Sequence, residues 1–371
     1  MKKLISLMII AVLCVPVCAR AAQKPVTGAE SFVLYCPQNG SVVLSQNAQK
    51  RMKPASTTKL MTTLLTLEAA QKSNRTVTFT RKMAAEGSSM YLKFGEKLRL
   101  DDLAAGMMMC SGNDAANAAA VTIGKTRGGF AKLMNKRAKQ IGMKHTNFVT
   151  PSGLDDDNHY TTAYDLALLM AAGLENKAFR ELTAQKSAGV SFVEPKGKTV
   201  SYNNHNKLLR LDPRCTGGKT GYTAAAGRCL VSSAEQNGVT LICVTLNDKN
   251  DWNDHIALYD YGFCALSAYS PGELSLEIPC VGGDGGSVTA VCKSNKPIIL
   301  KAGENKRVSQ VIIADAFLYA PVNKGSTVGS VEYRLDGKLL KKYRLTAQNE
   351  IKIQKVKTGF WQKIKEFFNH G

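Results

Sequence analysis

The sequence predicts an α+β protein in which a mixed first part is followed by a small, β-rich second part. Residues 24 to about 265 alternate helical and strand-like patterns, whereas residues 275 to about 356 consist of short β-type runs separated by turns. The composition changes near Ser270-Pro271-Gly272, a stretch typical of a turn or linker. A chain of 371 residues, 44% of them hydrophobic, is long enough for two or three domains.

The N-terminus has the layout of a secretory signal peptide. Met1-Lys2-Lys3 is basic, residues 4–17 are apolar, and small residues up to Ala21 offer a cleavage site. An uncleaved membrane anchor would require a longer apolar run, and a lipidated Cys18 would require a small residue where Val17 stands. We therefore predict a signal peptide over residues 1–21 and an exported mature protein.

The chain is strongly basic. Removing the three cations of the leader leaves +17 of the formal net charge of +20. Such an excess favours anionic partners, among them lipid headgroups, wall polymers and peptide carboxylates. We expect no nucleic acid partner, because the basic residues are spread along the chain without a recognisable binding module. No zinc-like cysteine spacing occurs, and we expect no metal and no cofactor.

Eight cysteines remain after the leader, and their state is open at this stage. Cys215 with Cys229, or Cys280 with Cys292, could pair in an oxidising compartment. Free buried thiols are the alternative, because cysteine readily behaves as a small core residue.

The C-terminal part predicts a β-rich domain over residues 274–356 and a terminal helix over residues 358–369. Strand patterns cover residues 311–313, 328–333 and 341–345, with turn residues at 323–325 and 336–338. In the terminal segment aromatic and aliphatic residues share one helical face: Phe360, Trp361, Ile364, Phe367 and Phe368. Such a helix fits reversible insertion at an anionic membrane surface, and docking on the β domain is the alternative.

Ser56 and Lys59 form the first candidate for catalysis. A helical pattern begins at Ser56, and a lysine three positions later projects from the same side of the helix. The pair can therefore act as nucleophile and base, provided that burial or a nearby cation lowers the pKa of the lysine, and we favour Lys219 as that cation. A serine at this position is also a common N-cap, so the motif alone is weak.

Two further motifs follow in the chain. Ser111-Gly112-Asn113 lies between two helical stretches, in a predicted loop. Lys219-Thr220-Gly221-Tyr222 forms a glycine-rich turn before two strands, where Lys219 and Thr220 would bind a carboxylate and Gly221 would admit a substrate backbone. A second Lys-Thr-Gly at residues 357–359 precedes no strand, so we assign it no catalytic role.

Together and in this order, the three motifs resemble those of penicillin-recognising serine enzymes, in particular the low-molecular-mass penicillin-binding proteins that act as D-alanyl-D-alanine carboxypeptidases. The resemblance spans nearly all of the mature chain and includes four further stretches, at residues 87–92, 143–148, 151–155 and 161–166. It implies a β-lactamase/transpeptidase-like catalytic domain over residues 24–268, built from an antiparallel sheet flanked by helices with a helical subdomain. A β-rich domain and a membrane-associating helix would follow.

The resemblance also implies the roles of the site residues. Ser56 would attack the penultimate D-alanine carbonyl, Lys59 would take its proton, and Ser111 would relay a proton to the leaving nitrogen. Asn113 would orient the substrate amide, and Lys219 and Thr220 would hold the terminal carboxylate. The backbone N–H groups of Ser56 and Tyr222 would form the oxyanion hole. Some relatives carry histidine in place of Tyr222, which leaves rate and substrate preference open.

The implied function is hydrolysis of the terminal D-alanine of peptidoglycan stem pentapeptides through a serine acyl-enzyme, which limits cross-linking. The expected partners are a stem peptide ending in D-Ala-D-Ala, β-lactams as covalent inhibitors and an anionic membrane surface. The site of action would be the outer face of the cytoplasmic membrane, the periplasm or the cell-wall space.

Three alternatives stand beside this function. An endopeptidase or transpeptidase of the same family would use the same serine, and an inactive wall-binding protein would share the charge and the terminal helix. A β-lactamase that deacylates through glutamate is disfavoured, because the chain has no Glu-x-x-Leu-Asn segment. The oligomeric state cannot be predicted from the sequence.

Overall fold

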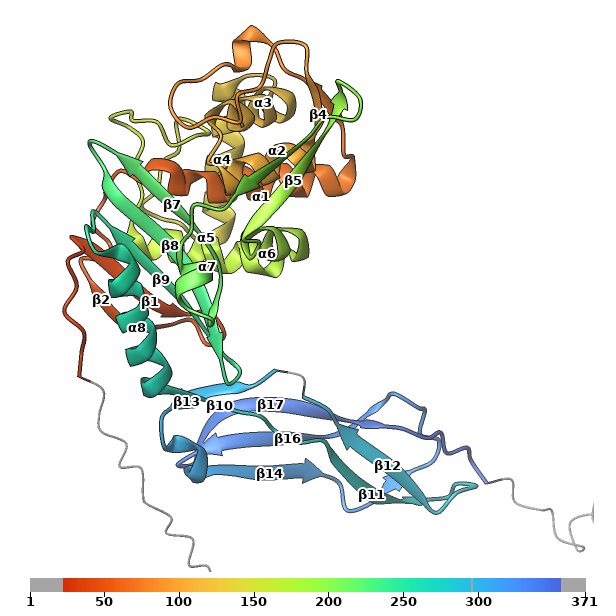
Figure 1. Ribbon diagram of the computed structural model, residues 1–371. Coiled ribbons are helices and arrows are strands. Elements are labelled where there is room, and N and C mark those ends of the chain that lie inside the picture. The colour runs from red at the N-terminus through yellow and green to blue at the C-terminus, as the bar shows by residue number, and fades with distance from the viewer. Residues whose placement is uncertain (1–22, 295, 355–371) are drawn as a thin grey trace, which may run out of the picture.

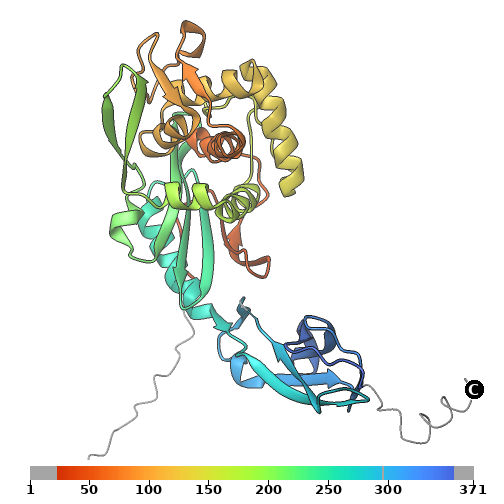
Figure 2. The same cartoon turned by 90° about the vertical axis from the view of Figure 1, so that its right-hand side faces the viewer.

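The computed structural model describes residues 23–294 and 296–354, which form two parts arranged end to end (Figure 1). The predicted signal peptide and terminal helix lie outside the described residues. The first part contains helices and strands, and the second consists almost entirely of strands. Figure 2 shows the same two parts from the side, joined where α8 (Asp251–Ala265) continues into β10 (Leu266–Tyr269). The predicted α+β fold class is confirmed.

A five-stranded antiparallel sheet organises the first part. Its order is β2-β1-β9-β8-β7, so β7 occupies one edge. The strands are β1 (Ser31–Cys36), β2 (Ser41–Gln46), β7 (Cys215–Thr223), β8 (Gly227–Gln236) and β9 (Val239–Leu246). The central strands β8 and β9 contain long runs of buried residues, which is typical of strands covered on both faces.

Helices cover both faces of this sheet. Alternate residues of β1 point to opposite faces, and they belong to two different hydrophobic cores. Val33 and Tyr35 pack into the larger core with α5 (Ala163–Glu175). Phe32 and Leu34 pack into the smaller core, which contains residues of α8.

A mostly helical subdomain lies beyond the β7 edge of the sheet (Figure 1). It begins with the 3₁₀ turn η1 (Ala55–Thr58), which leads directly into α1 (Lys59–Lys72). The other helices are α2 (Leu100–Met109), α3 (Asn113–Gly124), α4 (Arg127–Ile141), α6 (Lys177–Thr183) and the short α7 (Leu208–Leu211). A small antiparallel sheet of β3 (Thr76–Thr78), β4 (Lys97–Arg99), β5 (Ser187–Glu194) and β6 (Thr199–Asn203) completes it.

The second part is built on a six-stranded sheet with the order β14-β16-β17-β12-β11-β15. Its strands are β11 (Leu274–Val281), β12 (Ser287–Cys292), β14 (Val308–Ala314), β15 (Leu318–Tyr319), β16 (Thr327–Leu335) and β17 (Lys338–Ala347). β10 pairs with β13 (Ile298–Lys301) at the junction, where Ile299 joins the smaller core of the first part. The three strands predicted from the sequence fall within β14, β16 and β17.

The described cysteines are free thiols. Cys229 lies opposite Gly221 on β7, and Cys292 lies opposite Leu274 on β11. Each proposed partner is therefore six residues further along the neighbouring strand, or about 20 Å away, whereas a disulfide requires Cα atoms within about 7 Å. The sequence left open disulfides or free thiols, and the structure has free thiols.

None of the helices in the two described ranges is both long enough and apolar enough to cross a bilayer.

Candidate active site

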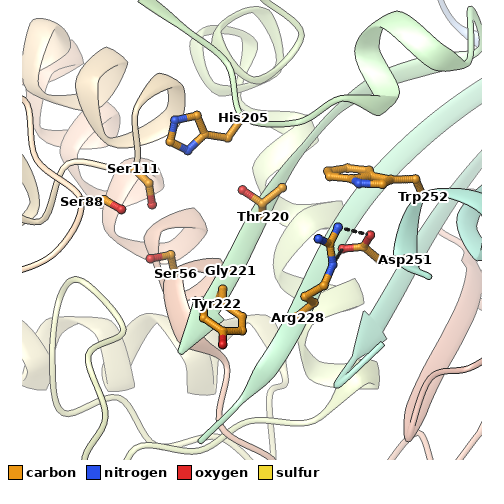
Figure 3. Close-up of a pocket in the computed structure, with 10 residues that line it drawn as sticks. All are labelled: Ser56, Ser88, Ser111, His205, Thr220, Gly221, Tyr222, Arg228, Asp251 and Trp252. Atoms are coloured by element: carbon orange, nitrogen blue, oxygen red, sulfur yellow. Dashed lines mark hydrogen bonds and ion pairs between the residues drawn. The ribbon is translucent and has the colours of Figure 1, made fainter. Parts of the chain in front are cut away.

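A cleft of about 480 Å³ opens between the β7 edge and the helical subdomain (Figure 3). Ser56, Ser88 and Ser111 lie on one side, whereas Thr220, Arg228 and Trp252 lie on the other. The three predicted motifs, far apart in sequence, all reach this region. Its lining is completed by His205, Gly221, Tyr222 and Asp251.

Ser56 lies in the η1 turn immediately before α1. Its side chain makes no capping hydrogen bond to either helix, so the N-cap alternative is wrong. The preceding residue, Ala55, has a φ of 48°, a conformation that side chains rarely adopt. Gly153 packs directly against this turn, because a Cβ atom there would lie 1.8 Å from the Ala55 carbonyl oxygen. The turn that presents Ser56 is therefore held by close packing.

The Lys59 ammonium group is fully buried beside Ser56. Its Nζ lies 2.9 Å from Ser56 Oγ, 2.6 Å from Asn113 Oδ1 and 2.8 Å from the Ser152 carbonyl oxygen. Two of these partners can only accept hydrogen bonds, whereas the serine hydroxyl can also donate. A neutral amine would thus donate to Asn113 and Ser152 and turn its lone pair toward Ser56.

Burial is the main reason why the pKa of Lys59 is lowered well below its usual value. The positive charge of Lys219 is the second cause. The requirement for a lowered pKa is therefore met, but Lys219, the neighbour favoured by the sequence, contributes less than desolvation. Opposing contributions from Cys110 and Asp114 are smaller still.

Ser111 lies in the short connection between α2 and α3, the inter-helical loop predicted from the sequence, and Asn113 directly follows that connection. Ser111 has a φ of 60° and lines the cleft. Asn113 is the first residue of α3, and both ends of its amide bind within the protein: Oδ1 accepts from Lys59, and Nδ2 donates to the Glu86 carbonyl at 2.6 Å. In this conformation Asn113 positions the lysine.

Lys219, Thr220, Gly221 and Tyr222 lie within strand β7, so the predicted turn is wrong. Lys219 Nζ donates to the Thr220 carbonyl at 2.8 Å, and burial lowers the pKa of Lys219 to about 7. The side chain of Tyr222 is exposed. The second Lys-Thr-Gly lies outside the described residues.

Gly221 allows β7 to approach the Ser56 turn. A Cβ atom at this position would lie 2.9 Å from the backbone nitrogens of both Ser56 and Thr57. Within the described ranges, the Ser56 N–H has no hydrogen-bond acceptor in the protein. The close approach therefore brings an unpaired N–H next to the strand edge, as an oxyanion hole requires.

Sequence reasoning missed the loop that supports Lys59. Ser152 acts through its backbone carbonyl, which no side-chain pattern reveals. His159 Nδ1 accepts from the Val149 and Thr150 N–H groups, so its Nε2 donates to Thr58 Oγ1 at 2.9 Å. Burial lowers the pKa of His159 to about 4, which keeps the ring neutral. The stretch at residues 151–155, noted only as part of the resemblance, was the available signal.

Three further cleft residues were also missed. Arg228 at the start of β8 forms an ion pair with Asp251, and its guanidinium lies 5.6 Å from the centre of the Trp252 ring. This group forms the wall opposite Ser56 (Figure 3). Across residues 23–294 and 296–354, no three His, Cys, Asp or Glu side chains are grouped so that they could hold a metal ion.

Family models match both parts of the chain. Residues 18–250 match the family described as D-alanyl-D-alanine carboxypeptidase, peptidase S11, and residues 265–353 match the penicillin-binding protein 5 C-terminal domain. The chain is 31% identical to D-alanyl-D-alanine carboxypeptidase DacA from Haemophilus influenzae over 88% of its length and 86% of that protein. It is 29% identical to DacF from Bacillus subtilis, over 91% of each chain.

Solved structures of a penicillin-binding protein and a DD-transpeptidase also align with this chain. Penicillin-binding protein 5 from Haemophilus influenzae aligns with a TM-score of 0.67 and 30% identity, over 89% of this chain and 99% of that one. A Streptomyces K15 DD-transpeptidase variant aligns with a TM-score of 0.61 and 28% identity, over 65% of this chain and 99% of that one.

Proposed function

The chain belongs to the D-alanyl-D-alanine carboxypeptidases of the low-molecular-mass penicillin-binding protein family, and on that premise we propose how its site acts. As a peptidase of this family it removes the terminal D-alanine from peptidoglycan stem pentapeptides, which limits cross-linking, and it binds β-lactams. Ser56 is the nucleophile. The observation that carries this proposal is the 2.9 Å contact between Ser56 Oγ and a buried Lys59 whose other two partners only accept hydrogen bonds.

In the acylation step the Ser56 hydroxyl proton passes to neutral Lys59, and Oγ attacks the carbonyl carbon of the penultimate D-alanine. The oxyanion accepts hydrogen bonds from the backbone N–H groups of Ser56 and Tyr222. The carbon–nitrogen bond then breaks, and Ser111 relays the proton held by Lys59 to the departing D-alanine nitrogen, which leaves Lys59 neutral again. The shortened stem peptide remains as an ester on Ser56.

Deacylation repeats the same chemistry with water. Water attacks the ester carbonyl as Lys59 accepts its proton, and the bond to Oγ breaks, which returns the proton to Ser56. Asn113 and the Ser152 carbonyl keep the amine aimed at the ester throughout. Asn113 would reach the substrate amide only by giving up one of its present partners.

The terminal carboxylate of the substrate is bound by electrostatic attraction. Lys219 is protonated below its pKa of about 7 and attracts the terminal carboxylate, to which the Thr220 hydroxyl donates. Because Lys219 is buried, its attraction for a carboxylate is screened less than that of a surface lysine.

Release of free D-alanine from a stem pentapeptide tests this function. We expect release by the mature protein and none by Ser56→Ala, with penicillin labelling lost in the same variant. An added amine acceptor and a cross-linked peptide dimer distinguish transfer and endopeptidase action from hydrolysis. A folded wild-type protein that neither releases D-alanine nor labels would instead support the inactive wall-binding alternative.

Export and membrane association are part of the same proposal. The leader and the aromatic face of residues 358–369 support them, and the boundaries of these segments remain predictions. Deleting residues 358–371 should move the mature protein from the membrane to the soluble fraction. A matched variant, Trp361→Ser with Phe368→Ser, should do the same, whereas Gln362→Ser on the polar side should not. Unchanged partitioning in the deletion would favour docking on the β domain.

A further inference from the structure

The outer edge of β7, which pairs with no other described strand, is closed at Gly218 by one threonine. The Gly218 N–H donates to Thr183 Oγ1 at 2.8 Å, and the Thr183 hydroxyl donates to the Gly218 carbonyl at 3.1 Å. In an antiparallel strand both backbone groups of a residue point to the same side. Thr183 therefore satisfies on the outer side of β7 the two groups that an added strand would pair with.

Thr183 is firmly fixed in this position. It is the last residue of α6 and is completely buried. A Cβ atom on the neighbouring Gly217 would lie 2.4 Å from Thr183 Cγ2, so the strand and the helix end are in direct contact. Helix α7 also packs against β7 (Figure 1).

The same end of the cleft has a further wall. His205 lines the cleft, and its backbone N–H donates to the Met109 carbonyl at 3.2 Å, which ties the segment before α7 to the end of α2. Figure 3 shows His205 at this end, beyond Thr220 and Ser111.

Among the described residues, the second half of the β7 edge has free N–H groups, whereas the Thr220 carbonyl accepts a hydrogen bond from Lys219 Nζ. Because strand residues alternate, the backbone groups of Thr220 and Tyr222 point to the same side as those of Gly218. Both residues line the cleft. Within the described part of the chain, no hydrogen-bond acceptor outside the sheet is found for the N–H of either residue. An extended peptide can therefore pair with β7 at Thr220 and Tyr222, and the next position, Gly218, is occupied.

We propose that Thr183 determines specificity by setting the length of the leaving group. This inference rests on the proposed function, which puts the reacting carbonyl at Tyr222 and the terminal carboxylate at Lys219 and Thr220. A leaving group with one more residue would have to continue along β7 by about 3.3 Å per residue, toward the Gly218 edge that Thr183 already occupies. Substrates that end at the released residue fit, and longer ones do not. Thr183 thus favours hydrolysis of the last peptide bond of a chain over hydrolysis of a bond one residue further from the C-terminus.

Two peptides test this role: a stem pentapeptide ending in D-Ala-D-Ala, and the same peptide extended by one C-terminal glycine. For each, kcat/KM is measured with wild type, Thr183→Ala and the matched control Thr183→Ser, which keeps the hydroxyl. We expect wild type and Thr183→Ser to prefer the pentapeptide strongly. In Thr183→Ala the ratio of extended peptide to pentapeptide should rise about tenfold or more, the scale of discrimination by shape.

A purely structural role would lower both rates together and leave the ratio unchanged, which would overturn the proposal. If Thr183→Ala does not fold, equal kcat/KM of the wild type for the two peptides would still overturn the proposal, because it would show that the edge is not closed to longer substrates. The proposed function fails separately, if wild type does not release D-alanine from the pentapeptide.

Discussion

The two parts of the chain bury different kinds of side chain. The first part buries charged and polar groups around the cleft, including Lys59, Lys219, Asp114 and His159. In the described portion of the C-terminal part, the buried polar side chains are Ser330 and Glu332, and the remaining core is apolar or aromatic. Burying a charge costs free energy unless the charge is paired. This unfavourable contribution to the free energy of folding therefore falls mainly on the first part.

In the first part, burial changes the protonation of the two lysines of the cleft. Burial is the main reason why the pKa values of Lys59 and Lys219 lie below 10.5, the usual value, at which both side chains would be charged at neutral pH. Among the described residues of the C-terminal part no lysine is buried, and three consecutive apolar residues of its edge strand β14, Val311, Ile312 and Ile313, are exposed. Substitutions around the cleft of the first part should therefore change chemistry, and those in the core of the second part should change stability alone.

Lys59→Gln should have the largest effect on chemistry. The substitution removes the base and keeps a polar side chain, so acylation by a fluorescent penicillin should slow by at least about 10²- to 10⁴-fold. Lys72→Gln, at the exposed end of the same helix, is the matched control and should label at the wild-type rate. Normal labelling of Lys59→Gln would show that another group takes the Ser56 proton.

Gly221→Ala should come next. The added methyl group would lie 2.9 Å from the backbone nitrogens of Ser56 and Thr57, which must move away from β7. Loss of one oxyanion donor slows catalysis about 10²- to 10³-fold, and we expect a decrease in kcat of that size. Gly128→Ala, where the methyl group meets open space, should leave kcat unchanged. Equal kcat values for Gly221→Ala and Gly128→Ala would contradict the proposed oxyanion hole.

Lys219→Gln should weaken substrate binding by a smaller factor. A hydrogen bond to a charged group contributes about 1.5–3 kcal/mol, or about 10- to 150-fold in kcat/KM. The effect should appear with a peptide that has a free terminal carboxylate and vanish with its methyl ester. Steady-state kinetics on both peptides measure the difference, and an equal loss on both would indicate a structural role.

The same lysine predicts a pH dependence. Because the pKa of Lys219 is lowered to about 7, its positive charge is present below that pH and is lost as the pH rises through it. The preference for the free carboxylate over the methyl ester, measured as a kcat/KM ratio, should therefore decline above about pH 7. In Lys219→Gln the ratio should not vary across this range.

Tyr333→Ala should have the smallest effect on chemistry. Tyr333 is buried in the C-terminal core between Tyr269 and Tyr343, and removing a large aromatic side chain costs about 3–5 kcal/mol of unfolding free energy. Denaturant unfolding of this part should show the loss, while penicillin acylation at a temperature where the protein is folded stays at the wild-type rate. A decrease in acylation would show that the two parts are coupled.

The sequence predicted the α+β class, the helix after Ser56 and the loop that contains Ser111, because hydrophobic period and helix boundaries are local signals. It failed at residues 217–221, where glycines indicated a turn. Gly217 and Gly218 have φ values of 154° and 151°, and they form part of a strand that packs against Thr183 and Ser232. Tertiary contact, which no local pattern encodes, decides that conformation.

The sequence predicted which residues belong to the candidate site, but only part of their arrangement in space. The structure brings Ser56, Lys59 and Asn113 into contact, with Ser111 and Thr220 on the same cleft, while their catalytic roles remain predictions. The carbonyl of Ser152 and the ring of His159 could not be predicted, because their contribution depends on a loop folding back 93 residues from Lys59. The sequence also could not show that burial contributes more than the charge of Lys219 to the lowered pKa of Lys59.

The most direct test of the central claim is to locate the acyl group. After reaction with a penicillin, intact-mass spectrometry followed by fragmentation of the tryptic peptide 52–59 should find one adduct, attached to Ser56 and absent from Ser56→Ala. An adduct on another residue, or one that persists in Ser56→Ala, would contradict the claim that Ser56 is the nucleophile activated by Lys59.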